Sequence, residues 1–129
     1  MVYGGGESRE PNREELFGDY RLRVISALDK NAVFANGERK NNIIDSLETL
    51  LKRVIDTFPI EKHDQIVNAI ADMIYLHAGQ KTRLSGELVI EHLLKTAYLL
   101  FDLVKDVKPE EVVTALLHDA IEDRAKTMI

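Results

Sequence analysis

Cysteine is absent from this chain, and so is any long hydrophobic run. Without cysteine the protein forms neither disulfides nor thiolate metal sites, which is compatible with a location in the cytoplasm. No apolar stretch approaches the ~20 residues that a helix needs to cross a bilayer. The polar, Gly-rich residues 1–12 also lack the apolar centre of a signal peptide. We therefore expect a cytoplasmic protein with no membrane partner.

An excess of basic residues is missing as well. The chain has 17 Lys and Arg against 22 Asp and Glu, which gives a formal net charge of -5. General nucleic-acid binders are usually basic, so we expect no nucleic-acid partner. The 129 residues are 45% hydrophobic, which is enough for one globular domain with a core of its own.

Strand patterns are absent too, because no segment alternates apolar and polar residues. Apolar residues instead recur every three to four positions, and the predicted fold class is all-α with four or five helices. The expected helices cover residues 14–28, 43–58, 62–78, 88–104 and a segment that starts at Pro109. Residues 31–42 are expected to form a loop, with Asn42 as the N-cap of the helix that follows.

The four histidines are the first candidates for chemistry. His63 lies among charged residues at a helix start, so we expect it on the solvated surface. His77 lies on an apolar helix face near the helix end, where a histidine is more often structural than a metal ligand. His92 opens a long apolar helix and taken alone would also be interpreted as structural.

A second group of ionisable residues lies in the segment 115–123, beside a hydrophobic stretch. His118 and Asp119 are adjacent, and Glu122 and Asp123 follow one turn later. Ionisable groups at the edge of a core are costly unless they are paired or hold a metal. The alternative is a capping or surface pair at His118 and Asp119, followed by two solvated acids.

Helix order is expected to bring His92 close to His118 and Asp119. Helices that are adjacent in sequence tend to pack antiparallel, so the start of one lies beside the end of the next. Two imidazoles and a carboxylate suit Mn²⁺, Fe²⁺ or Zn²⁺. Such an ion with three protein ligands lowers the pKa of a bound water. We therefore predict a divalent transition metal as the cofactor.

The loop before His92 adds Lys81, Arg83 and Ser85. Cationic side chains and a hydroxyl beside a metal suit a phosphorylated substrate. A solvated loop is the alternative interpretation of these three residues.

Three segments of the chain, in this order, resemble the HD hydrolase domain of the RelA/SpoT family. They are His77-Ala78-Gly79-Gln80, Arg83-x-Ser85-Gly86-Glu87-x-x-Ile90-x-His92 and Ala115-Leu116-Leu117-His118-Asp119-Ala120-Ile121-Glu122-Asp123. The resemblance covers about Ala71 to Asp123. It implies a helical bundle of the HD-domain type. It also implies removal of the 3′-pyrophosphate from the guanine nucleotide (p)ppGpp, a stringent-response signal, with Mn²⁺.

The resemblance implies a role for each residue of the metal centre. His92, His118 and Asp119 match the family's metal ligands. Glu122 and Asp123 match the pair of acids that positions and activates the attacking water.

The resemblance also implies how the nucleotide is held. Arg83 matches the arginine that packs against the guanine base, and Ser85 matches a serine that contacts the nucleotide. His77 matches a motif residue that is not a metal ligand. The chain departs from the family at Leu88-Val89, where Pro-Tyr is usual.

The family's fourth metal ligand is an Asp on a later helix, whereas the sequence stops at Ile129. We therefore expect a C-terminally incomplete HD domain at 65–129. Residues 1–13 would be a flexible leader and 14–64 a helical region of unknown role.

An incomplete HD domain leaves two other interpretations open. The domain could be catalytically inactive and act as a helical interaction or regulatory module. It would then expose Ile121, Met128 and Ile129, which favours a homo-oligomer. A plain helical bundle without a site fits the composition but leaves the three ordered segments as a coincidence.

Overall fold

The computed structural model describes the backbone of residues 11–31, 37–77 and 89–127, and the side chains within these ranges except residue 31 and those after residue 118. In this part of the chain there are five α-helices, one short 3₁₀-helix and no strand, so the all-α prediction is confirmed. The elements are α1 (Arg13–Asn31), α2 (Gly37–Thr57), η1 (Ile60–Lys62), α3 (His63–His77), α4 (Val89–Leu103) and α5 (Pro109–Thr127).

Local sequence explains where α1 and α5 begin. At α1 the Glu15 backbone N–H donates to Asn12 Oδ1 at 2.9 Å, and the Asn12 N–H donates back to Glu15 Oε1 at 3.1 Å. At α5 the Lys108 N–H donates to Glu111 Oε1 at 2.8 Å, with Pro109 at the first helical position. These capping boxes satisfy backbone donors that a helix start leaves without an intrahelical partner.

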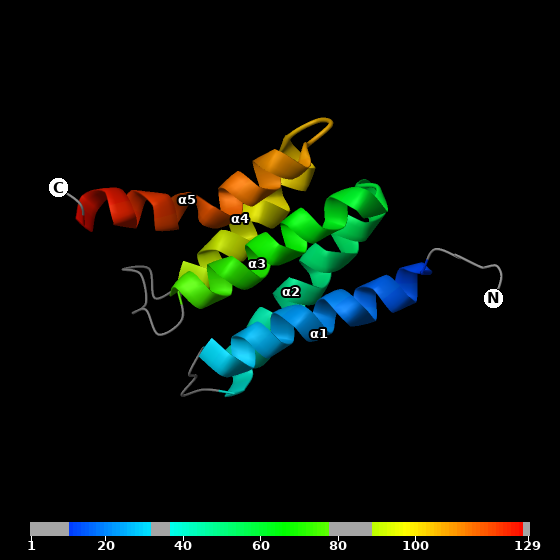
Figure 1. Ribbon diagram of the computed structural model, residues 1–129, viewed down its shortest axis with the longest axis horizontal. Coiled ribbons are helices and arrows are strands. Elements are labelled where there is room, and N and C mark those ends of the chain that lie inside the picture. Colours follow the sequence, from blue (N-terminus) through cyan, green and yellow to red (C-terminus); the bar gives the residue numbers. More distant parts are fainter. Residues whose placement is uncertain (1–10, 32–36, 78–88, 128–129) are drawn as a thin grey trace.

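The helices form two layers (Figure 1). Helices α1, α3 and α5 run in one direction, and α2 and α4 return in the opposite direction. Helix α3 packs against both α1 and α5 and also touches α2 and α4, while α2 packs on α1 and α4, and α4 packs on α5. The central position of α3 explains why it buries residues on several sides, including both of its histidines.

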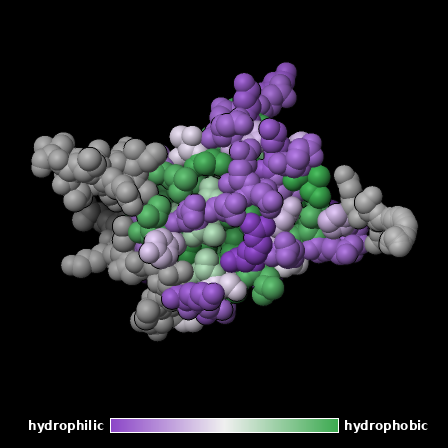
Figure 2. Space-filling view, viewed as in Figure 1, coloured by the Kyte–Doolittle hydropathy of each residue, from purple (hydrophilic) through white to green (hydrophobic). Residues whose placement is uncertain are grey.

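One hydrophobic cluster joins residues from all five helices, and α3 supplies its centre. The predicted boundary between residues 64 and 65 falls in the first turn of α3, and the division into domains stays a prediction. None of the described helices is both long and apolar enough to cross a membrane. On the face seen in Figure 1, hydrophobic patches alternate with hydrophilic ones (Figure 2).

The start of α2 corrects one prediction. The helix begins at Gly37, so residues 37–42 are helical rather than part of a loop, and Asn42 lies within the helix instead of capping it. Ion pairs hold this polar first section in place. Lys40 lies 2.7 Å from Asp29 of α1, and Arg39 contacts Glu91 of α4 at 3.3 Å.

His63 corrects a second prediction, because it is buried rather than solvated, with 2% of its surface exposed. Its Nε2 lies 2.8 Å from the Phe58 carbonyl oxygen, which can only accept, so Nε2 carries the proton. In the neutral ring Nδ1 therefore accepts a hydrogen bond from the Tyr20 hydroxyl at 2.9 Å. Burial raises the pKa of Tyr20, and the carboxylate of Asp64 adds to the rise.

Candidate metal site

The candidate site begins with a stripe of residues on α4. His92, Thr96, Leu99 and Leu103 are spaced three or four residues apart and therefore share one side of the helix. The Thr96 hydroxyl donates to the His92 carbonyl oxygen at 2.9 Å within this stripe. His92 is partly buried and lies in the first turns of α4.

Helix α5 presents a matching stripe that contains Glu111, Ala115 and His118. Helices α4 and α5 pack against each other in opposite directions (Figure 1). An apolar groove between them is lined by Leu100 of α4 and by Glu111 and Ala115 of α5, which fixes how the two helices are aligned. The antiparallel arrangement predicted from the sequence is therefore present.

This alignment sets the relative heights of the two histidines. The groove is lined by Leu100 on α4 and by residues between 110 and 115 on α5. At a rise of 1.5 Å per residue, His92 lies about 12 Å from Leu100 along the helix axis. On the same scale His118 lies roughly 8 Å from the middle of 110–115, in the same direction. The two backbone positions thus differ by only about 4 Å in height.

The His118 ring is held by its own helix. Its Nδ1 lies 2.8 Å from the carbonyl oxygen of Ala115, one turn earlier, and His118 is partly buried. Because a carbonyl oxygen only accepts, Nδ1 must donate its proton, and Nε2 carries the lone pair of the neutral ring. A histidine that ligates a metal commonly donates its second ring N–H to a backbone carbonyl in this way.

Several predicted site residues lie outside the described side chains. Asp119, Glu122 and Asp123 are in the helical backbone of α5, but their side chains are not described. Arg83 and Ser85 fall in the range 78–88, outside the described residues. Among the described side chains no group of three or more His, Asp or Glu residues could hold a metal. The predicted ligand set includes Asp119, so it extends beyond the side chains in which that search was possible.

His77 is buried, with 3% of its surface exposed, and it is the last residue of α3. The end of α3 and the beginning of α4 lie at the same end of the bundle (Figure 1). His77 therefore comes from the end of the bundle that also holds His92. Its burial agrees with the structural role predicted for it.

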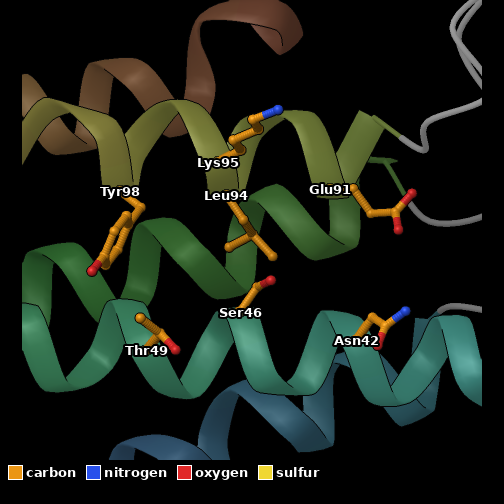
Figure 3. A pocket seen from close by; sticks show the side chains of 7 residues that line it. All are labelled: Asn42, Ser46, Thr49, Glu91, Leu94, Lys95 and Tyr98. Carbon is orange, nitrogen blue, oxygen red and sulfur yellow. The ribbon is translucent and has the colours of Figure 1, made fainter.

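A different cavity, of about 330 Å³, lies between α2 and α4 (Figure 3). Ser46 and Thr49 of α2 line one wall, opposite Leu94 and Tyr98 of α4. The α4 residues that line this cavity alternate with the His92 stripe and face another side of the helix. The cavity is therefore separate from the candidate metal site, and its lining brings together none of the predicted site residues.

Sequence reasoning missed two contacts that matter for these histidines. One is the Tyr20 hydroxyl on His63, across 43 residues of chain. The other is the Ala115 carbonyl that orients His118. The second contact had a usable signal, since a side chain can reach the carbonyl one turn earlier on its own helix. The first had none, because nothing local links the two positions.

No protein-family model, curated protein or solved structure matches this chain.

Proposed function

We propose that the protein is a metal-dependent phosphohydrolase of the HD type that removes the 3′-pyrophosphate of guanosine tetra- or pentaphosphate. One observation carries the proposal. The antiparallel α4–α5 pair sets His92 and His118 at nearly the same height on neighbouring helices. The order of the three sequence segments, which ends in His118-Asp119 and Glu122-Asp123, supplies the reaction class.

The described residues suit a divalent transition metal. His118 Nδ1 is tied to the Ala115 carbonyl, so the ring presents the lone pair of Nε2. His92 and Asp119 would complete a set of two imidazoles and one carboxylate, which Mn²⁺, Fe²⁺ and Zn²⁺ accept. When bound, such an ion lowers the pKa of a coordinated water and polarises a phosphate oxygen.

The remaining residues have separate tasks in the proposed reaction. Glu122 and Asp123 follow His118 by one turn, and their carboxylates orient the attacking water and accept its proton. The Arg83 guanidinium packs on the guanine base, and the Ser85 hydroxyl holds the nucleotide by a hydrogen bond. The Ala115 carbonyl acts only through His118, as a positioning group.

The test combines metal binding with turnover. Mn²⁺ binding is measured by calorimetry, and pyrophosphate release is measured with ppGpp as substrate. We expect His92→Ala and His118→Ala each to weaken Mn²⁺ binding by at least about tenfold and to abolish turnover. Thr114→Ala, on an exposed position of the same helix, is the control and should change neither. Circular dichroism confirms that each variant folds.

Two results would decide against the enzyme. Equal Mn²⁺ binding and equal turnover in the wild type and both histidine variants would rule out the site. Mn²⁺ binding that depends on both histidines, without hydrolysis of ppGpp, would leave a metal-binding module in place of the hydrolase.

A further inference from the structure

The outer side of the α4–α5 pair exposes hydrophobic residues beside an apolar cavity. Leu103 is 77% exposed and Leu99 is 41% exposed, and both belong to the same stripe of α4. The neighbouring cavity, of about 370 Å³, lies between Leu100 of α4 and Thr114 and Ala115 of α5. A protruding leucine and an apolar hollow thus lie within one turn of each other on one face. Burying Leu103 would remove a large apolar side chain from water.

We propose that this face is the surface through which two copies of the chain dock, with the α4–α5 groove of each copy receiving Leu103 of the other. A two-fold axis passing near Leu103 satisfies both contacts at once, because each copy supplies one leucine and one groove. The observation is independent of the metal site, so the proposal holds or fails separately from the proposed hydrolase activity.

The charges around the groove favour a second copy as the occupant. Lys105 and Glu110 are exposed residues on either side of the turn between α4 and α5, and neither forms an ion pair within the described part of the chain. Their opposite charges lie on the same rim. A two-fold axis at the height of Leu103 brings Lys105 of one copy opposite Glu110 of the other, and the reverse contact forms on the far side of the axis. The rim is therefore complementary to itself.

The first experiment measures mass in solution as a function of protein concentration, by sedimentation or light scattering. We expect the wild type to reach twice the chain mass of 14.6 kDa. Leu103→Ala removes two buried leucines per dimer and should weaken association by about a hundredfold. Leu103→Glu should leave only the monomer. The matched control is Leu22→Glu, because Leu22 is 67% exposed on α1, whose main contacts are with α2 and α3.

The second experiment tests the charge pairing. Lys105→Glu and Glu110→Lys each place like charges across the axis, so each variant alone should be monomeric where the wild type is a dimer. Mixing the two variants pairs opposite charges at both contacts and should restore the dimer. The double variant should dimerise by itself for the same reason.

Other outcomes would overturn the proposal. These are a monomeric wild type at all concentrations, a dimer that survives Leu103→Glu, and dissociation caused equally by Leu22→Glu. Failure of the mixed charge variants to associate would refute the two-fold arrangement. Unchanged circular dichroism of every variant ensures that a monomer is a folded monomer.

Discussion

The contact between Tyr20 and His63 offers the sharpest test of how the first part of the chain is held to α3. The change is Tyr20→Phe, which removes one oxygen and keeps the ring. The aromatic contact with the His63 ring, edge to face at 87° with centroids 5.5 Å apart, can therefore remain. What is lost is the hydrogen bond from the hydroxyl to His63 Nδ1 at 2.9 Å.

The cost follows from the position of His63. Its Nε2–H is committed to the Phe58 carbonyl, so Nδ1 cannot gain a proton without giving the ring a charge in a site that is only 2% exposed. The variant thus leaves a buried acceptor without its donor, which costs about 1–3 kcal/mol of unfolding free energy. For a domain of this size each kcal/mol shifts Tm by about 4 °C, so we expect a decrease of roughly 4–12 °C.

The assay is urea unfolding at neutral pH, followed by circular dichroism, together with thermal melting. Tyr75→Phe is the matched control, because Tyr75 is 68% exposed and its hydroxyl should contribute less than about 0.5 kcal/mol. A Tyr20→Phe variant as stable as Tyr75→Phe would show that the buried pair does not hold α1 on α3, and the reasoning would be refuted.

Two further predictions concern the same region and its helix start. Burial and the Asp64 carboxylate raise the pKa of Tyr20 above its ordinary value near 10, so the native state favours the neutral phenol. The resulting stability is complete below about pH 10 and is lost as pH rises toward the folded pKa, and urea unfolding from pH 8 to 11 should show a decrease that Tyr20→Phe lacks. At the other site, Asn12→Ala breaks the capping box of α1 and should cost about 1 kcal/mol in urea unfolding. Asn42→Ala, at an exposed position inside α2, should change stability by less than about 0.5 kcal/mol, and an equal effect of the two substitutions would contradict the capping role.

Much of the fold followed from local signals. The apolar period of three to four residues predicted the helices, and the structure places α3 and α4 within a residue or two of the expected bounds. Pro109 and Glu111 marked the start of α5 by their side-chain chemistry. The start of α2 was missed because Arg39 and Lys40 give no apolar period, and their ion pairs reach residues on other helices.

The candidate site was predictable only to the level of helix order. Consecutive helices with a short connection pack antiparallel, which was enough to place His92 and His118 at one end of the bundle. The orientation of the His118 ring depends on a hydrogen bond to Ala115 that residue spacing permits but does not require.

By itself the sequence determined which residues become helical and which helix faces are apolar, because both depend on neighbours within one or two turns. The tertiary structure alone decided that His63 is buried, since its partner Tyr20 comes from another helix, 43 residues away. It also decided that Leu103 faces outward beside an apolar groove. Helical periodicity marks a residue as apolar, but only the packing of all five helices determines whether another part of the same chain covers it.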